Sequence, residues 1–527
     1  MNTGKNYIGN RLKARGSKTY RTFNPLMNLE NETLFYEASP EEINEAVSLA
    51  NEAFPVYSQK SGIEKAGFLR AIADEILALG DTLISTYCME TGLPEGRAIG
   101  ERGRAMGQLR AFAELLEEGS WLGATIDTAQ PNREPLPRPD LRKMMVPLGP
   151  VTIFGASNFP FAFSTAGGDT ASALAAGCPV LLKSHPMHAG TSEMVASAII
   201  KAADSTGMPN GVFSHLNSSG NEVGRQLVQH EGVAAVGFTG SLRGGRALFD
   251  LAGERKTPIP VFAEMGSVNP VVLLPEALEK GGASWAKNYA GSITLGSGQF
   301  CTNPGLLLGI EGKALQSFIE KLSEEILAVA PSSMLHPNIK RAFEQGKQNA
   351  VAQEDTRVAA AYTGEVATNY AQQLVLMVSG ATFLRNTTLH QEVFGPFALV
   401  VQCRDRKELE AVISRLEGQL TGTVIATPEE LPDYVDILAA LQGRVGRLIF
   451  NGVPTGVEVA PAMQHGGPYP ATTDSRFTSV GTHAINRWVR PVSFQDCPDA
   501  LLPDALKNAN PLGIHRMVDG KLTRSSL

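Results

Sequence analysis

The chain has 527 residues, of which 43% are hydrophobic and 19% charged, and its formal net charge is -7 at pH 7. This length predicts two or three domains of ordinary size. The acidic balance argues against a nucleic-acid surface or a polybasic membrane patch and favours a soluble protein with small-molecule partners.

No stretch of the sequence approaches the roughly 20 apolar residues of a membrane-spanning helix. The basic N-terminal residues lack a continuous apolar region, so we expect an exposed segment there and not a transit peptide. The five cysteines show neither CxxC spacing nor a dense framework, which argues against a structural zinc site or disulfides. A cytoplasmic protein is therefore expected.

The chain opens, after this segment, with a helical region. Residues 40–123 carry apolar side chains at three- and four-residue spacing, which predicts helices throughout. Residues 128–142 are rich in proline and charge, so an extended linker or an edge segment is expected there.

Short apolar runs then alternate with helical stretches, a pattern that predicts a parallel, doubly wound α/β sheet. The strands of this sheet are expected at 151–154, 179–183, 211–213, 233–238 and 259–263. A second α/β unit begins near residue 269. Its expected strands are 271–274, 305–310, 398–401, 422–426 and 447–450. The pattern between 331 and 380 does not resolve into elements. Ligands of such sheets bind at the carboxyl ends of the strands.

Polar residues stand at several of these strand ends. Asn158 follows the first strand, where its amide could donate to an oxyanion or satisfy the backbone of a turn. Lys183 and Ser184 follow the second, placing an ammonium and a hydroxyl where a cofactor ribose or phosphate would lie; a solvent-facing lysine is the alternative. Gly240 and Ser241 lie in a glycine-rich turn that opens a helix, which suits either a bound pyrophosphate or a purely structural turn.

The most reactive pair of side chains is Glu264, after the fifth strand, and Cys301, which stands among small residues between Gly296 and Pro304. A thiol with little bulk around it is accessible to a substrate, whereas an inert cysteine is packed in apolar surroundings. His185 and His188 are three residues apart but have no third ligand nearby in the sequence, so no metal is expected.

Taken together, these residues resemble the aldehyde dehydrogenase superfamily, over a stretch from about Tyr7 to Pro491. The motifs in family order are Ser157–Pro160, Lys183, Phe238–Ser241, Glu264–Gly266, Gly298–Cys301 and Glu392–Pro396. The resemblance implies an α/β fold of two doubly wound domains, one for the cofactor and one for catalysis, with a small β oligomerisation flap.

The resemblance also implies domain bounds. Residues 1–130 and 150–266 would form the cofactor-binding domain with its helical lead-in, and 267–483 the catalytic domain that carries the nucleophilic cysteine. Residues 131–149 and 484–527 would form the flap and a C-terminal tail. Pairing of 141–146 with 488–494 would build the flap, and a homodimer or homotetramer would assemble through it.

The same resemblance assigns roles. Cys301 would attack the aldehyde carbon, Asn158 would help hold the oxyanion, and Glu264 would activate water to hydrolyse the thioester. The cofactor would be bound by six residues: Lys183 and Glu392 on the two riboses, Ser184 beside Lys183, Gly240 and Ser241 at the phosphates, and Phe394 beside the nicotinamide.

Two departures from the common family pattern matter. Glu264-Met-Gly-Ser267 replaces Glu-Leu-Gly-Gly, which leaves the base in place. Many NAD-preferring members carry a carboxylate three positions after the lysine, where this chain has Pro186. Because that carboxylate would repel a 2'-phosphate, and because His185 or His188 could attract one, we expect NADP, with NAD as the alternative.

Within the superfamily, the segments 183–190 and 465–481 are similar to the branch of 2,5-dioxovalerate (α-ketoglutaric semialdehyde) dehydrogenases, and also to NADP-dependent fatty aldehyde dehydrogenases. The expected reaction is oxidation of 2,5-dioxopentanoate to 2-oxoglutarate, and a fatty or general aldehyde is the alternative. Glu264 argues against a CoA-acylating relative, and the pair Cys301 and Glu264 against a non-catalytic member. A substrate carboxylate would need a cation, for which the candidates are Arg97, Arg102, Arg104 and Arg110.

Overall fold

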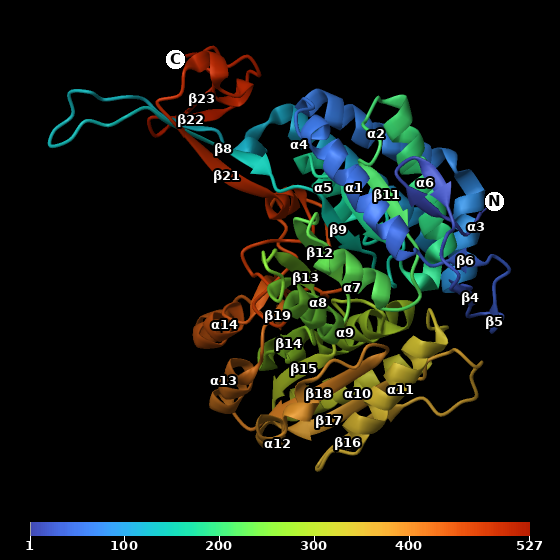
Figure 1. Ribbon diagram of the computed structural model, residues 1–527. Helices are drawn as coiled ribbons and strands as arrows, with labels where there is room; N and C mark the ends of the chain where they lie inside the picture. Colours follow the sequence, from blue (N-terminus) through green and yellow to red (C-terminus); the bar gives the residue numbers. More distant parts are fainter. Residues whose placement is uncertain (1) are drawn as a thin grey trace.

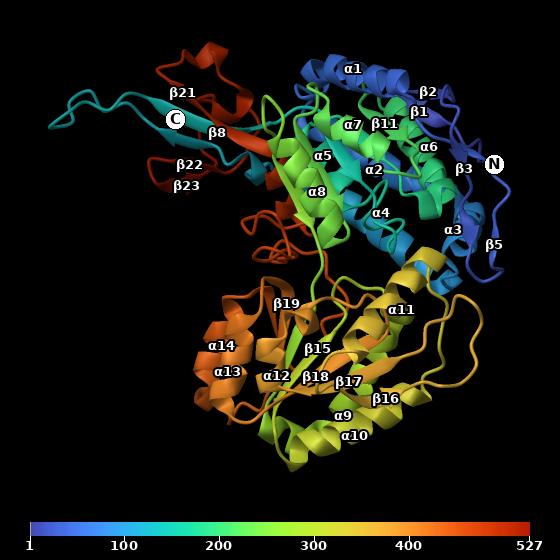
Figure 2. The ribbon, with the colours of Figure 1, turned by 60° about the horizontal axis from the view of Figure 1, so that its bottom comes forward.

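The computed structural model describes residues 2–527 and contains three large β-sheets, two of them surrounded by helices (Figure 1). The blue-to-green and the yellow-to-orange parts of the chain form two α/β units, which Figure 2 shows one above the other. A third, smaller sheet projects from the first unit. Within the described residues, no helix is both long and apolar enough to cross a membrane.

Four helices occupy the region in which the apolar spacing predicts them. Capping boxes begin two of these helices: Ser39 accepts from the Glu42 N–H, and Ser61 accepts from the Glu64 N–H, with each glutamate bonding back. The longest helix ends at Gly119, whose backbone is left-handed. The four are α1 (Pro40–Tyr57), α2 (Gly62–Ala78), α3 (Gly80–Thr91) and α4 (Glu95–Glu118).

The first unit is built on a seven-stranded sheet with the order β13-β12-β9-β10-β11-β1-β2. Its five central strands are parallel, as predicted, and each overlaps its expected range. They are β9 (Val151–Phe154), β10 (Val180–Lys183), β11 (Phe213–Leu216), β12 (Ala235–Thr239) and β13 (Val261–Glu264). The helices between them are α5 (Gly168–Ala176), α6 (Ala189–Ser205), α7 (Glu222–Gln229) and α8 (Leu242–Gly253).

The N-terminal residues differ from their prediction as an exposed segment. β1 (Asn6–Ile8) pairs antiparallel with β11, and β2 (Arg11–Lys13) pairs with β1, so the hairpin extends the sheet. Asn6 and Ile8 are 0% and 1% exposed. Because neighbouring side chains of a strand point to opposite faces, a short strand joins the core through alternate residues while its basic neighbours stay outside. A strand of three residues is too short for the alternation of buried and exposed side chains to be recognised in the sequence.

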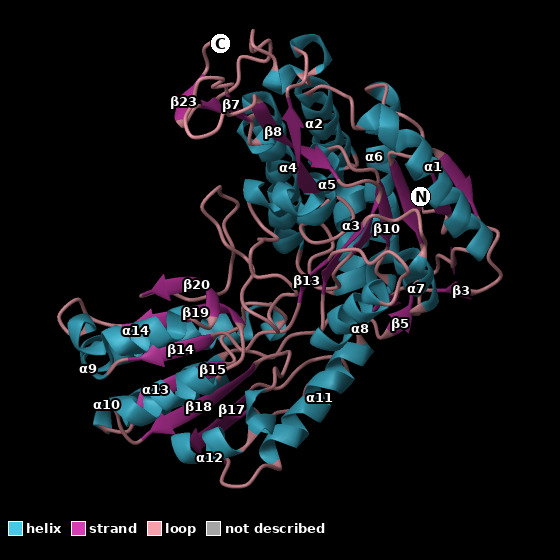
Figure 3. Ribbon diagram, turned by 60° about the vertical axis from the view of Figure 1, so that its left-hand side comes forward, coloured by secondary structure: helices cyan, strands magenta, loops and turns pink. Residues whose placement is uncertain are grey.

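The second unit is also a seven-stranded sheet, with the order β16-β17-β18-β15-β14-β19-β20, in which β16 is antiparallel. The strands are β14 (Pro270–Leu273), β15 (Leu306–Ile310), β16 (Arg357–Ala361), β17 (Leu374–Ser379), β18 (Phe397–Cys403), β19 (Gln419–Ile425) and β20 (Val445–Phe450). The helices are α9 (Pro275–Thr294), α10 (Lys313–Ala328), α11 (Pro337–Val351), α12 (Gly380–Arg385), α13 (Arg406–Arg415) and α14 (Val435–Gln442). Apolar cores lie on both faces of the sheet, under helices that Figure 3 draws in cyan.

The stretch 331–380, for which the sequence pattern predicts no elements, contains α11, β16 and β17.

Short elements complete the chain. Two small hairpins pair β3 (Thr19–Tyr20) with β6 (Phe35–Tyr36) and β4 (Phe23–Asn24) with β5 (Leu29–Glu30). The 3-10 helices are η1 (Ser120–Leu122), η2 (Pro186–His188), η3 (Leu295–Gly298), η4 (Thr387–His390), η5 (Leu431–Tyr434), η6 (Thr482–Trp488), η7 (Asp499–Leu501) and η8 (Asp504–Leu506).

The third sheet has the order β21-β8-β7-β22-β23. β8 (Leu141–Pro147) pairs antiparallel with β21 (Val489–Gln495), which is the pairing expected of the flap. β7 (Thr125–Asp127) and the C-terminal strands β22 (Arg516–Val518) and β23 (Lys521–Thr523) also belong to this sheet, so the end of the chain is more than a tail. Between β7 and β8, the proline-rich residues form the long loop at the left of Figure 1.

A buried tryptophan anchors the third sheet to the first unit. Trp488, just before β21, is 0% exposed. Its indole N–H donates to the hydroxyl of Ser172 at 2.7 Å, and its ring centroid lies 5.5 Å from that of Phe262. The neighbouring Arg487 forms an ion pair of 2.7 Å with Asp169.

Replacing Trp488 by alanine should lower the free energy of unfolding by about 3–5 kcal/mol, because it removes a large buried ring and leaves a cavity. Thermal unfolding of the Trp488→Ala variant measures this loss. Trp285→Ala is the matched control, since Trp285 is only half-buried and should cost less. Equal losses in the two variants would contradict the anchoring role of Trp488.

Candidate functional site

The carboxyl ends of the strands of the first sheet face the amino ends of the strands of the second sheet where the chain passes from β13 to β14. Glu264 is the last residue of β13, and the segment 465–480 lies against the same strand through a bridge between Glu264 and Thr472. Cys301 comes from the second unit, in the loop between η3 and β15. The site therefore combines residues from both units, as expected of ligand sites at strand ends.

The loop that carries Cys301 has an unusual backbone. Gly296, Ser297 and Gly298 all have positive φ, at 54°, 55° and 65°. A Cβ on Gly298 would lie 2.2 Å from the carbonyl oxygen of Gly395, so only glycine fits there. This close approach holds the loop against the segment that contains Glu392.

A buried amide holds the same loop from the other side. Asn269 is 0% exposed, and its Nδ2 donates to the carbonyl oxygens of Cys301 at 2.8 Å and Asn303 at 2.9 Å. The nucleophile candidate is thus fixed through its own main chain to the start of β14.

Three side chains converge at the centre of the site. The Sγ of Cys301 lies 3.5 Å from Nε2 of His465, and the same nitrogen lies 2.9 Å from Oε1 of Glu264. The hydroxyl of Ser479 donates to the other oxygen of Glu264 at 2.5 Å. His465 is 0% exposed and Glu264 3% exposed. One imidazole nitrogen therefore meets both groups, and a thiol, an imidazole and a carboxylate this close can exchange a proton among themselves.

The pKa values of the cluster follow from burial and from the neighbours. Burial raises the pKa of the Cys301 thiol well above its usual value, and the adjacent Glu264 carboxylate raises it further. Burial alone would also raise the pKa of Glu264. His465, together with the hydroxyl of Ser479 and the thiol of Cys301, outweighs burial and lowers it. Glu264 is therefore ionised at neutral pH, and the thiol needs a base before it can react.

His465 is the functional residue that the sequence reasoning did not find. It is 164 positions from Cys301 in the chain, so no local motif links the two. The available signal was its position at the start of the segment 465–481, which carries the branch resemblance. The reactive atoms of Glu264, Cys301 and His465 lie within 4.8 Å of one another, which is also a separation that metal ligands can have.

Asn158 lies in the loop after β9, and its Nδ2 donates to the carbonyl oxygen of Gln299 at 3.0 Å, two residues before Cys301. An amide carries two donors, so one N–H stays available for an oxyanion. The loop is held by Glu101, whose carboxylate accepts from the N–H groups of Phe161 and Ala162 at 2.8 and 3.0 Å.

The six expected cofactor residues lie at the carboxyl edge of the first sheet and on the facing loop of the second unit. Lys183 ends β10, and Ser184 donates to Asn217 at 3.2 Å. Burial lowers the pKa of Lys183 to about 8, partly opposed by Glu37, so the ammonium keeps its charge at neutral pH. Within the described chain Lys183 has no ion-pair partner, and such a free ammonium suits a ribose or a phosphate.

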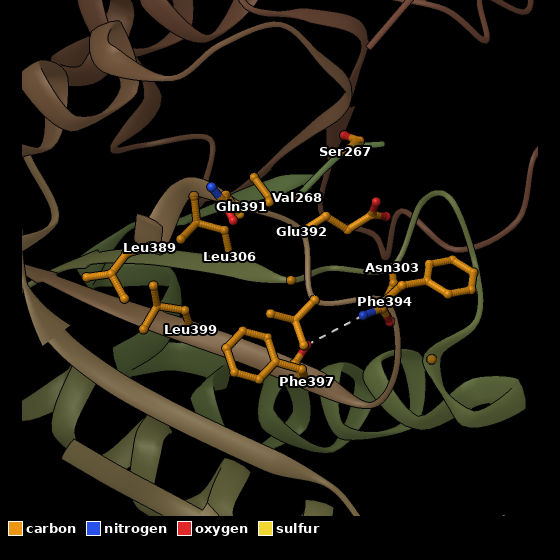
Figure 4. A pocket seen from close by; sticks show the side chains of 13 residues that line it. Ser267, Val268, Asn303, Leu306, Leu389, Gln391, Glu392, Phe394, Phe397 and Leu399 are labelled. Atoms are coloured by element: carbon orange, nitrogen blue, oxygen red, sulfur yellow. Dashed lines mark hydrogen bonds between the residues drawn. The ribbon is translucent and has the colours of Figure 1, made fainter. Parts of the chain in front are cut away.

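The other cofactor residues frame the same edge. Ser241 caps α8 by accepting from the Gly244 N–H at 3.2 Å, directly after Gly240. Figure 4 shows Glu392 and Phe394 lining a pocket that also reaches Ser267. A Cβ on Gly266 would lie 2.6 Å from the Glu392 carboxylate, so the glycine allows this carboxylate to pack closely against the chain after β13. The set of residues therefore fits a dinucleotide.

The two histidines after β10 add no positive charge. Burial lowers the pKa of His188 to about 4, and its Nε2 contacts the carbonyl oxygen of Ala156 at 2.7 Å. Burial and the neighbouring His188 and Lys183 also hold the pKa of His185 well below its usual value. Both imidazoles are therefore neutral at neutral pH in the unliganded chain, so they supply no positive charge toward a 2'-phosphate there, and the expectation of such an attraction stays a prediction.

The four candidate arginines of α4 have different surroundings. Arg97 lies 3.6 Å from Glu101 and over the ring of Phe300. Arg102 reaches the carbonyl oxygen of Gly80, and Arg110 pairs with Asp74 at 3.0 Å on the surface. Arg104 points toward the site, over the ring of Phe163 at 5.7 Å.

Comparison with known proteins places the chain. The model of the aldehyde dehydrogenase family matches residues 12–488. Over 523 residues the sequence is 49% identical to alpha-ketoglutaric semialdehyde dehydrogenase 2 of Azospirillum brasilense, covering 98% of this chain and 99% of that protein. It is 45% identical over 525 residues to the alpha-ketoglutaric semialdehyde dehydrogenase of Acinetobacter baylyi, covering 99% of both.

Solved structures share the fold at low sequence identity. The methylmalonate-semialdehyde dehydrogenase of Oceanimonas doudoroffii superimposes with a TM-score of 0.79 at 18% identity, covering 94% of this chain and 98% of the other. A variant of the betaine aldehyde dehydrogenase of Staphylococcus aureus, solved with NAD+, gives a TM-score of 0.80 at 18% identity, covering 94% and 97%.

The contact between His465 and the thiol predicts an effect on thiol chemistry. His465→Asn should slow alkylation of Cys301 by iodoacetamide near neutral pH by at least about tenfold, because the buried thiol loses its proton acceptor. Mass spectrometry of the peptide that contains Cys301 measures the rate. His483→Asn, at an exposed histidine, is the control and should leave the rate unchanged. An unchanged rate in His465→Asn would remove His465 from the chemistry of the thiol.

Proposed function

Because the chain belongs to the aldehyde dehydrogenase family, we propose that it oxidises 2,5-dioxopentanoate (α-ketoglutaric semialdehyde) to 2-oxoglutarate with NADP or NAD. One observation carries the chemistry: a half-buried thiol lies against an imidazole that contacts an ionised carboxylate. The full-length similarity to the two α-ketoglutaric semialdehyde dehydrogenases supports the choice of substrate.

The first step forms a bond from Cys301 to the aldehyde. The pair of Glu264 and His465 takes up the thiol proton, and Sγ attacks the aldehyde carbon, whose C=O electrons move to the oxygen. The free N–H of Asn158 and the main-chain N–H of Cys301 donate to that oxyanion. Preorganised donors of this kind stabilise developing charge without reorganising at the moment of reaction.

When bound, a nicotinamide cofactor would supply the oxidising power as the acceptor of a hydride. Lys183, Ser184 and Glu392 would hold the riboses, Gly240 and Ser241 would hold the phosphates, and Phe394 would lie beside the nicotinamide. The charged ammonium of Lys183 and the common pocket of Glu392 and Phe394 support this placement.

The second step hydrolyses the thioester. Glu264 accepts a proton from water, and the water oxygen attacks the acyl carbon. The C–S bond then breaks and the sulfur leaves as a thiolate. One of the two protons now held by Glu264 and His465 goes to the sulfur and restores the thiol, and the other is released to solvent. The carboxylic acid is released. The low pKa of Glu264 keeps it ionised and able to accept the proton at neutral pH.

Assembly and location complete the proposal. The chain forms a homodimer or homotetramer through the third sheet, and acts in the cytoplasm. The long loop between β7 and β8 supports this use of the sheet, because it projects away from the rest of the chain and exposes Leu136 at 69%.

Substitutions of the two catalytic residues should have different effects on the reaction. Cys301→Ala should abolish oxidation of 2,5-dioxopentanoate, whereas Glu264→Gln should form about one reduced cofactor per site in a burst and then stall at the thioester. The absorbance of the reduced cofactor, followed in stopped flow, measures both outcomes.

In the wild type, kcat/KM for 2,5-dioxopentanoate should exceed that for pentanal. Normal steady-state turnover by Glu264→Gln would contradict the role of Glu264. Absence of turnover by the wild type with 2,5-dioxopentanoate and either cofactor would overturn the proposed substrate.

For the cofactor we propose NADP, because Pro186 leaves no carboxylate to repel a 2'-phosphate and Lys183 supplies a cation nearby. Pro186→Glu should lower kcat/KM with NADP, relative to that with NAD, by about tenfold or more. Pro186→Gln has nearly the same shape without the charge and is the control. A similar change in both variants would assign the effect to the loss of proline instead of the added charge.

A further inference from the structure

Two arginines near the site have no acidic partner. Arg104 lies on α4 and Arg447 on β20, and neither forms an ion pair with any described residue of the chain. Instead, both bind main-chain carbonyls of the loop that follows β20. Arg104 donates to Val457, and Arg447 donates to Pro454 at 2.9 Å and to Gly456 at 3.2 Å. These hydrogen bonds to the loop fix the orientation of both guanidinium groups.

Each guanidinium retains N–H donors that have no hydrogen-bond acceptor among the described residues. Nε and Nη2 of Arg104 and Nε of Arg447 are buried nitrogens without a hydrogen-bond acceptor. Buried polar groups of folded proteins are almost always paired, and an unpaired cation away from water is costly. Donors of this kind in a site indicate a ligand that supplies the acceptors.

Both arginines lie beside the residues that surround the reacting thiol. The ring of Phe163 lies 5.7 Å from the Arg104 guanidinium and 6.1 Å from the imidazole of His465. Arg447 contacts the sulfur of Met463 at 3.9 Å, two residues before His465. Both cations are therefore near the segment that carries the imidazole in contact with Cys301.

The other arginines of α4 are already partnered. Arg97 lies on the same face, two helical turns before Arg104, but it stacks on Phe159 at 4.4 Å and lies 3.6 Å from Glu101. Arg102 and Arg110 bind Gly80 and Asp74 elsewhere. Of the four, only Arg104 keeps buried donors free.

We propose that Arg104 and Arg447 bind the carboxylate at the far end of the aldehyde and so select aldehydes that carry a terminal carboxylate. This inference rests on the proposed oxidation of an aldehyde at Cys301. A carboxylate offers about four lone-pair sites, which match the free donors of two guanidinium groups. A neutral aldehyde leaves these donors unpaired, which is how a polar pocket rejects an analogue that lacks the partner group.

The test compares substrates within each variant. In Arg104→Met and in Arg447→Met, the ratio of kcat/KM for 2,5-dioxopentanoate to that for pentanal should fall by about 10- to 100-fold, mainly through KM. Glutarate semialdehyde should follow 2,5-dioxopentanoate, because it carries the same terminal carboxylate. Arg104→Lys should restore part of the ratio, and glutarate should inhibit the wild type competitively but the methionine variants weakly.

Arg110→Met is the matched control, since it removes an arginine of the same helix at the surface and should leave the ratio unchanged. An equal loss on acidic and neutral aldehydes would give the two arginines a structural role and overturn the inference. So would an undiminished ratio in both methionine variants.

Preference of the wild type for glutarate semialdehyde over 2,5-dioxopentanoate would overturn the proposed substrate alone, provided that the arginine variants still lose the acidic aldehydes. A wild type that oxidises only neutral aldehydes would overturn both. Should a methionine variant fail to fold, as judged by circular dichroism, the lysine variant and glutarate inhibition decide the question.

Discussion

The chemistry of the site depends on the contact of the Cys301 thiol with the imidazole of His465. Glu264, His465 and Ser479 belong to a layer of chain around β13, where Met265 donates to Ala471 at 2.8 Å. Cys301 belongs to the other side. Its loop is fixed by Asn269 and by the close approach of Gly298 to Gly395. The base and the nucleophile are thus carried by different bodies.

Burial sets the chemistry of this junction. Water is removed from a thiol, an imidazole and a carboxylate together, so each group governs the protonation of the next more strongly than it would in solvent. The carboxylate of Glu264 stabilises a proton on the neighbouring groups, while the imidazole of His465 compensates the negative charge of that carboxylate. The same low exposure makes the nearby guanidinium groups of Arg104 and Arg447 costly unless an anion accompanies them.

The sequence predicts the parallel strands of both sheets well, because their apolar runs are long and bounded by turns. It fails for β1, whose three residues are too few to show alternation, and for β16 and β17, which flank a long polar loop. Cys301 and Glu264 carry local signals, namely small neighbours and a strand end. His465 carries none, since only folding brings it beside a thiol 164 residues away. The neutrality of His185 and His188 is likewise invisible, because it results from burial.

The connection from β13 to β14 gives this division of the site a mechanical meaning. Residues 265–269 join the units, and Asn269, at the end of that connection, holds the main chain of the nucleophile loop. The 3.5 Å contact between Sγ and Nε2 of His465 therefore depends on the alignment of the two units as well as on the folding of each sheet. Activity is for this reason a stricter measure of the native arrangement than the integrity of either sheet alone.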